Sequence, residues 1–283
     1  MRRASDHVER LRATLSVRTV YADLDGTLLG PGGSLFASVD GVTAEPAIAI
    51  TSLALAGIDL VLMSGRTQAQ IREVARVLGA RAYIAELGGL IVYRDGYEET
   101  VIRQPGASRG RGNAHEAIER SGAAGLLLDS YPGLLEPHSP WSFAFRECSV
   151  LLRGQVGVAD ANALLVKAGY GWLELQDNGV IPRRGRFPGL DVEEVRAYHL
   201  VPAGISKRSA VALDRERRAL PREACIAVGD SASDADVAGE VGVAFVVANG
   251  EPGVRGLSLP ENVYLLDRGH GLGFADAIGL FTS

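Results

Sequence analysis

The sequence is short of two residue types, cysteine and lysine. Its two cysteines, Cys148 and Cys225, match no metal-ligand spacing and are too few for a disulfide framework in 283 residues. This favours a reducing compartment, and we expect the cytoplasm. The net charge of -5 leaves no basic surplus for a phosphate backbone, which argues against nucleic acid as a partner. No apolar run is long enough to span a bilayer, which argues against a membrane partner.

The remaining composition is that of an ordinary globular chain. Hydrophobic residues make up 47% and charged residues 22%, and the length allows one large domain or two medium ones. Residues 1–16 are basic but lack the apolar segment of a secretory signal. We expect them to form an N-terminal extension with a solvated, frayed helix. For the oligomeric state we expect a monomer or a dimer.

Two parts of the chain, residues 17–104 and 199–283, alternate apolar strands with amphipathic helices. Near-continuous apolar strands alternating with helices are typical of a mainly parallel sheet covered on both faces. The sequence therefore predicts an α/β, Rossmann-like core of three layers. One of its helices is expected over residues 43–56, with Thr43 as the N-cap.

Residues 105–198 do not show this regular alternation of strands and helices, and they begin with a linker rich in glycine and arginine. We expect a long strand over residues 142–154. The sequence DNG at residues 177–179 predicts a hairpin turn between two further strands. The sequence thus predicts an inserted α+β domain that divides the core into two segments.

Polar residues collect where the predicted core strands end. In an open parallel sheet, ligands bind at the carboxyl ends of the strands. These ends, together with the start of one helix, supply Asp23, Asp25, Thr27, Ser64, Gly65, Arg66, Lys207, Asp230 and Asp234.

Four carboxylates beside hydroxyls and one ammonium suit a phosphate ester held on Mg²⁺, because magnesium prefers hard oxygen ligands shared with a substrate phosphate. Each motif has an ordinary structural interpretation when taken alone, as a turn, a helix start or a surface charge. Lys207 is one of only two lysines among 29 basic residues, which suggests that a compact point charge is needed there. Occurring together and in this order, the motifs favour a phosphate site.

The motifs DLDGT, SGR, GISK and GDSASD resemble the four signatures of the haloacid dehalogenase superfamily of phosphohydrolases, in the same order. The insert lies between the second and the third. This arrangement is similar to that of the Cof-like and sucrose-phosphatase-like branch, which carries a large α/β cap. The resemblance covers essentially the whole chain.

The resemblance implies that Asp23 is the nucleophile and forms an aspartyl-phosphate. It implies that Asp25 is the general acid for the leaving alcohol and then the base for water. The phosphate-binding residues that it implies are Thr27, Ser64, Gly65 and Lys207. Mg²⁺ would be held by Asp23, by the Asp25 backbone carbonyl and by Asp230, with Asp234 completing or orienting its shell.

Two positions depart from the family pattern. Ser233 stands where Cof-like members usually have asparagine, although trehalose-phosphate phosphatases carry a hydroxyl residue there. Leu87 replaces the asparagine of the ENGG turn, which puts a substrate contact in doubt and leaves the core chemistry intact.

Charged residues of the insert, together with Arg66 of the core, are candidates for substrate recognition. The candidates are Arg66, Arg146, Glu147, Arg183, Arg184 and Arg186. The three arginines after the DNG turn form either a solvated rim or a clamp for an anionic or polyhydroxylated substrate. Arg146 and Glu147 either pair across strands on an exposed face or face the substrate.

The sequence as a whole predicts a Mg²⁺-dependent phosphatase of a small phosphorylated metabolite, with a sugar phosphate as the expected substrate. One alternative is a sugar phosphomutase of the phosphomannomutase type, which would pass the phosphoryl group to another hydroxyl. A second alternative is a non-catalytic module that binds a phosphate ligand.

Overall fold

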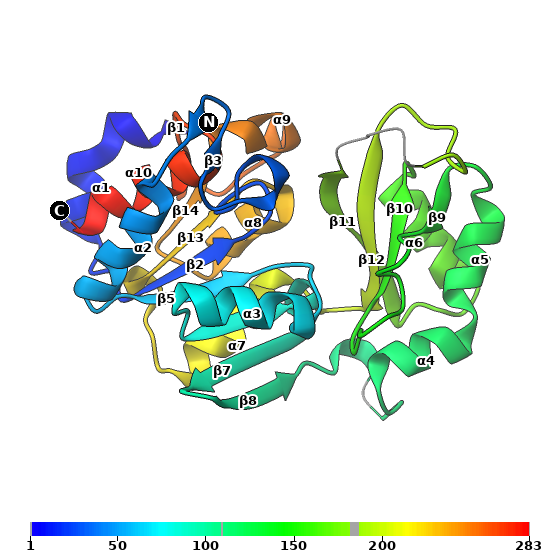
Figure 1. Cartoon of the computed structure of the whole chain (residues 1–283). Helices are drawn as coiled ribbons and strands as arrows, with labels where there is room; N and C mark the ends of the chain where they lie inside the picture. The colour runs from blue at the N-terminus through cyan, green and yellow to red at the C-terminus, as the bar shows by residue number, and fades with distance from the viewer. Residues whose placement is uncertain (1, 109, 182–186, 283) are drawn as a thin grey trace.

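The computed structural model describes residues 2–108, 110–181 and 187–282. Among these residues, nine strands form one sheet in the order β1-β15-β14-β13-β2-β5-β6-β7-β8, which lies in the left-hand body of Figure 1. Their bounds are β1 Arg2–Arg3, β2 Thr19–Asp23, β5 Asp59–Met63, β6 Ala82–Ala85, β7 Leu90–Asp95, β8 Glu98–Arg103, β13 Cys225–Gly229, β14 Val243–Val246 and β15 Val263–Leu265. In this spatial order, all neighbouring strands from β1 through β15, β14, β13, β2 and β5 to β6 pair in parallel. The strands β7 and β8 then add antiparallel pairs at one edge. The predicted α/β fold with a mainly parallel sheet is confirmed.

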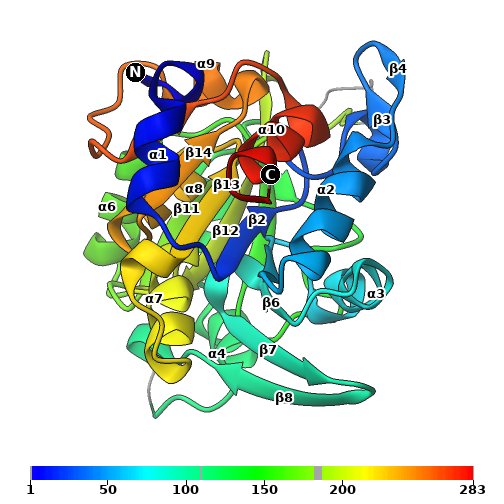
Figure 2. The same cartoon turned by 90° about the vertical axis from the view of Figure 1, so that its left-hand side faces the viewer.

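Helices cover both faces of this sheet. Successive strand residues point to opposite faces, so Val20 and Ala22 of β2 pack in one apolar cluster and Tyr21 in another. One cluster includes side chains from α1 Val8–Thr14, α2 Glu45–Leu55, α3 Gln68–Leu78 and α10 His270–Thr282. The other includes side chains from α7 Lys207–Arg217, α8 Ala232–Asp236 and α9 Glu251–Val254. Figure 2 shows α2 and α10 on one side of the strands and α7 on the other, which gives the predicted three layers.

The helices that follow β5 and β13, and the helix α7, begin with side-chain caps at the same edge of the sheet. Thr67, Ser206 and Ser231 each accept a hydrogen bond from the backbone amide three residues on and form a capping box. These caps fix where α3, α7 and α8 start. The helix expected over residues 43–56 is observed as Glu45–Leu55, with Ala44 rather than Thr43 at the N-cap.

A second sheet lies in the right-hand body of Figure 1, between the core and α5. Among the described residues, four antiparallel strands form it in the order β11-β12-β10-β9, with an apolar cluster under α4, α5 and α6 on one face. The bounds are α4 Ala114–Ser121, α5 Ala123–Ser130, β9 Leu135–Pro137, β10 Val150–Gly154, α6 Val158–Lys167, β11 Leu173–Ile181 and β12 Val195–Pro202. We propose this body as the inserted cap domain. Because β12 continues to Pro202, the proposed cap is better ended there than at residue 198.

Two predictions for the insert are wrong. The DNG sequence does not make a hairpin: β11 runs through it, and its pairing with β12 shifts between Asp177 and Val180. Asp177 accepts a hydrogen bond from the Gly179 amide, and Gly179 has φ +97°, so the turn sequence makes a bulge within one strand. The strand expected over residues 142–154 is confined to Val150–Gly154.

The N-terminal helix is also not frayed. Leu11 of α1 is buried in the core cluster that includes α10, and Arg2 and Arg3 pair in parallel with β15. A small hairpin, β3 Ala37–Ser38 with β4 Gly41–Val42, projects from the loop after β2. Within the described residues, no helix has both the length and the apolar character needed to cross a membrane.

Candidate active site

Three carboxylates meet where β2 and β13 end. Asp23 is the last residue of β2, Asp230 follows β13, and Asp234 lies in α8. Each offers an oxygen atom within 4.8 Å of the others. A Cβ at Gly26, whose φ is +88°, would lie 2.1 Å from Oδ2 of Asp230, so only glycine allows the first loop to approach this closely. The predicted convergence of the first and last motifs is thus present in the geometry.

Lys207 lies within this cluster. Its Nζ donates to Oδ1 of Asp23 at 2.7 Å and to Oδ1 of Asp234 at 2.7 Å, and all three side chains are buried. Burial alone would lower the pKa of the lysine, but the two carboxylates outweigh it and raise this pKa above its usual value. The ammonium therefore remains charged and holds one oxygen of Asp23 in place.

The cluster carries more negative than positive charge. Burial, and then the charge of Asp234, raise the pKa of Asp230 to about 7. Burial also raises the pKa of Asp23, against the opposing effect of Lys207. Three acids facing one ammonium leave negative charge uncompensated in a low-dielectric site. Since these groups are all hard oxygen donors, they fit a divalent cation such as Mg²⁺.

The two carboxylates beside Lys207 differ in what their oxygens contact. Asp234 has both oxygens engaged: Oδ1 by Lys207, and Oδ2 by the amide and hydroxyl of Ser231. Asp23 has its Oδ1 held by Lys207. Asp234 is thus arranged to orient its neighbours, and the other oxygen of Asp23 can react.

Hydroxyl and amide donors surround the carboxylates. Thr27 is fully buried and its Oγ1 has no hydrogen-bond partner within the described chain. Such a buried hydroxyl is costly unless a ligand satisfies it. Ser64 and Gly65 follow β5, and among the described residues the Gly65 amide also has no partner. Both groups are available to a phosphate.

Asp25 lies at the rim of the cluster and is paired with Arg66. The guanidinium donates from Nη2 to Oδ1 at 2.6 Å and from Nε to Oδ2 at 2.8 Å. Burial opposes the charge of Arg66, yet Asp25 raises the pKa of the guanidinium above its usual value. Arg66, expected as a substrate contact, here contacts the expected acid.

The structure separates the candidates of the insert. Arg146 is buried, and its Nη1 lies 3.5 Å from the Gly65 carbonyl oxygen. Glu147 instead pairs with Arg103 of β8 at 2.6 Å. Neither lies in a strand, which excludes the cross-strand pairing that was one of the two alternatives for them. Arg183, Arg184 and Arg186 lie outside the described residues.

Three residues that sequence reasoning did not select also lie at the site. Asn249 donates to the Gly26 carbonyl at 2.8 Å. His199 is buried with both ring nitrogens unpartnered among the described residues, and a Cβ on Gly65 would lie 2.7 Å from its Nε2. Glu86 is buried in the turn after β6. The ELGG turn was the signal for Glu86 and the hinge position was the signal for His199, whereas nothing local marked Asn249.

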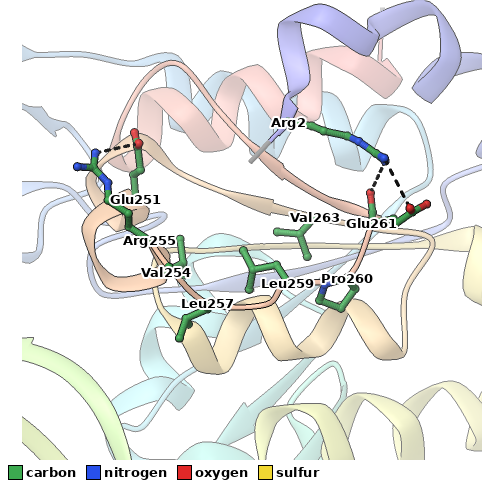
Figure 3. Close-up of a pocket in the computed structure, with 10 residues that line it drawn as sticks. Arg2, Glu251, Val254, Arg255, Leu257, Leu259, Pro260, Glu261 and Val263 are labelled. Atoms are coloured by element: carbon green, nitrogen blue, oxygen red, sulfur yellow. Dashed lines mark hydrogen bonds and ion pairs between the residues drawn. The ribbon is translucent and has the colours of Figure 1, made fainter.

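A surface pocket of about 360 Å³ lies elsewhere, between α9 and β15 (Figure 3). Arg2 pairs there with Glu261, and Arg255 with Glu251. None of the predicted site residues that the structure describes lines this pocket, so it is not the candidate active site.

The comparisons with known proteins agree with this geometry. Residues 20–116 match the family model of haloacid dehalogenase-like hydrolases, and this stretch contains the first two motifs. A phosphoglycolate phosphatase of Methanoculleus marisnigri is 29% identical over 93% of this chain and 95% of its own length. One of Methanothrix thermoacetophila is 24% identical over 93% of this chain and 96% of its own length.

The family model and the curated relatives support a haloacid dehalogenase superfamily phosphatase. Solved structures show the same fold: the sucrose-phosphatase from Synechocystis, in complex with sucrose and phosphate, gives a TM-score of 0.62 at 15% identity. The alignment with the sucrose-phosphatase covers 94% of this chain and 98% of the sucrose-phosphatase chain. A haloacid dehalogenase-like hydrolase from Bacteroides thetaiotaomicron gives 0.61 at 17% identity, covering 93% and 99%. Together with the family model and the curated relatives, they support the Cof-like and sucrose-phosphatase-like branch.

Within this superfamily the chain is an enzyme of the phosphatase class. All four curated relatives are named as phosphatases and match 83% to 93% of the chain. They come from Methanoculleus, Methanothrix, Archaeoglobus and Methanospirillum. The non-catalytic alternative is therefore not retained.

Proposed function

We propose that this phosphatase hydrolyses a small phosphate monoester through an aspartyl-phosphate on Asp23. The observation that carries the proposal is Lys207 Nζ at 2.7 Å from Oδ1 of Asp23, inside a buried acidic cluster. With Oδ1 held, the other carboxylate oxygen attacks phosphorus, the P–O bond to the leaving group breaks, and the alkoxide takes a proton. Asp25, at the rim of the cluster, would supply that proton and later accept one from the attacking water. Hydrolysis of the acyl phosphate then releases inorganic phosphate and restores Asp23.

The residues fit one Mg²⁺, which we propose as the cofactor. Asp23 and Asp230 would hold it with the Asp25 backbone carbonyl, and Asp234 would orient the set, since both of its oxygens are already bonded. When bound, the ion neutralises charge on the phosphoryl oxygens and on the carboxylates. Thr27, Ser64 and the Gly65 amide bind the remaining phosphoryl oxygens.

We propose 2-phosphoglycolate, a small phosphorylated hydroxy acid, as the first substrate to test. Four curated relatives bear the name phosphoglycolate phosphatase, and two of them match more than 90% of this chain. The sugar phosphate expected from the sequence is the second candidate class.

The test is release of inorganic phosphate from a panel with Mg²⁺ present. The panel holds 2-phosphoglycolate, 3-phosphoglycerate, glucose 1-phosphate, glucose 6-phosphate and trehalose 6-phosphate. We expect the highest kcat/KM with 2-phosphoglycolate. Preference for a sugar phosphate would overturn the substrate proposal but keep the phosphatase. Conversion of glucose 1-phosphate to glucose 6-phosphate without phosphate release would support the mutase alternative.

A further inference from the structure

The turn Glu86–Gly88 after β6 has an unfavourable backbone. Glu86 has φ +49° and Leu87 φ +55°, values that residues with a side chain rarely adopt. A Cβ on Gly88 would lie 2.1 Å from the Ser206 carbonyl oxygen, so the turn packs directly on the residue before Lys207. Strain of this kind persists only where surrounding contacts fix it, and it is frequent at functional sites.

This turn and one insert side chain together hold every carbonyl of the phosphate-binding turn. The Leu87 amide donates to the Ser64 carbonyl at 3.2 Å, and the Glu86 amide donates to the Arg66 carbonyl at 3.0 Å. Arg146 Nη1 donates to the carbonyl between them, that of Gly65, at 3.5 Å. With all three acceptors engaged, the Gly65 amide, which has no partner among the described residues, is the backbone donor of this turn that remains available to a phosphate.

The carboxylate of Glu86 holds the insert segment that carries Arg146. Glu86 is 0% exposed. Its Oε1 accepts from the Glu147 amide at 2.8 Å, and its Oε2 accepts from the Cys148 amide at 3.0 Å and from Ser149 Oγ at 2.7 Å. Because the core takes the backbone amides of Glu147 and Cys148, these two residues cannot use them to extend the pairing of β10.

The same contacts bind and compensate Arg146. Its Nη1 donates to Ser149 Oγ at 2.9 Å and lies 3.9 Å from Oε2 of Glu86, and its Nε donates to the Trp141 carbonyl at 2.7 Å. A buried guanidinium without a carboxylate nearby would be costly. Glu86 thus fixes Arg146 both through charge and through Ser149.

We propose that Glu86 is a positioning residue for phosphate binding, acting through Arg146 and Ser149 on the turn Ser64–Arg66. The backbone amide of Glu86 donates to this turn from the core. Its side chain binds the insert segment, and Arg146 of that segment donates to the same turn. This inference deepens the proposed function and rests on it, because it assumes that Ser64 and Gly65 bind the phosphoryl group.

The test measures the Kd of inorganic phosphate by calorimetry in the presence of Mg²⁺, beside KM and kcat for the best ester. Glu86→Gln keeps the shape of the side chain and removes its charge. We expect the Kd of phosphate and the KM of the ester both to rise about tenfold. Ser149→Ala should fold normally and give a smaller rise. Because Glu86 acts through Arg146, the double variant Glu86→Gln/Arg146→Met should be no worse than the worse single variant.

Asp214→Asn is the matched control. Asp214 is also a fully buried carboxylate, bonded to Tyr21 and Arg218 away from the site. It should lower the Tm without changing the phosphate Kd. The inference is overturned if Glu86→Gln behaves like this control, or if its effect and that of Arg146→Met simply add.

The calorimetric readout separates the two proposals. A wild-type protein that binds phosphate but cleaves no ester would contradict the proposed function, and the Kd of Glu86→Gln would still decide the inference. A wild-type protein that binds no phosphate would overturn both.

Discussion

The guanidinium of Arg66 holds both carboxylate oxygens of Asp25, at 2.6 Å from Oδ1 and 2.8 Å from Oδ2. Asp25 follows β2 and Arg66 follows β5, and these strands are neighbours in the sheet. The Asp25 side chain is 54% exposed, so the pair contributes little to stability. Its value lies in orientation, since it fixes the acid beside Asp23 until a substrate oxygen replaces one contact.

Removing this arginine should therefore impair turnover more than folding. For Arg66→Met we expect kcat to fall about tenfold, a part of the 10²–10⁴ that a general acid contributes, with an unchanged Tm. Steady-state kinetics with an alkyl phosphate measure it, and p-nitrophenyl phosphate is the comparison because its leaving group needs no proton. An unchanged or higher kcat for the alkyl ester would show that the pair does not orient Asp25.

Lys207 supports both stability and catalysis. Lys207→Met leaves Asp23 and Asp234 buried without their counter-charge, which should destabilise the protein by about 3–5 kcal/mol in urea unfolding without Mg²⁺. Lys167, the other lysine, is exposed on α6, and Lys167→Met should change stability by less than about 0.5 kcal/mol. Equal effects of the two variants would contradict the charge balance described for the site.

A histidine of the insert should make folding stability depend on pH. Burial, with help from Arg153 and Arg146, lowers the pKa of His138 from 6.5 to about 4. The unfolded chain therefore takes up a proton near pH 6.5 that the folded chain refuses until about pH 4. Stability from this residue is complete above pH 6.5 and is lost as the pH falls toward 4. His138→Gln should reduce the fall of Tm between pH 7 and pH 4.5. An identical pH profile in the variant would show that His138 contributes nothing to it.

Binding of Mg²⁺ should stabilise the folded protein as well as activate the enzyme. An ion that binds the acidic cluster of the folded state alone adds about 2.7 kcal/mol at a hundredfold excess over Kd. Chelation should thus lower the Tm and abolish phosphate release, and both should return with Mg²⁺. Asp230→Asn should lose this Tm response because it removes one of the three clustered carboxylates. A Tm insensitive to Mg²⁺ in the wild type would argue against the cation site.

The sequence predicted the convergence of the acids because parallel strands bring their carboxyl ends to one edge regardless of loop detail. Asp23 and Asp230 sit at the ends of adjacent strands β2 and β13, so their meeting follows from strand order alone.

What the sequence could not supply were contacts between distant segments. The DNG signal favoured a hairpin, but pairing of β11 with β12 on both sides of the bulge outweighed it. A strand was expected to run through residues 147–149, yet Glu86, far back in the chain, accepts from the amides of Glu147 and Cys148 and from the hydroxyl of Ser149. Such tertiary competition for backbone groups leaves no local trace.

The most direct measurement of the central claim is phosphate release by Asp23→Asn beside the wild type, with Mg²⁺ and 2-phosphoglycolate or the best ester of the panel. Asparagine keeps the shape of Asp23 but cannot form an acyl phosphate by attack on phosphorus. The account predicts a fall in kcat of about 10³-fold or more, as expected for loss of a nucleophile, in a protein with an intact circular dichroism spectrum. Turnover within tenfold of the wild type would contradict catalysis through Asp23.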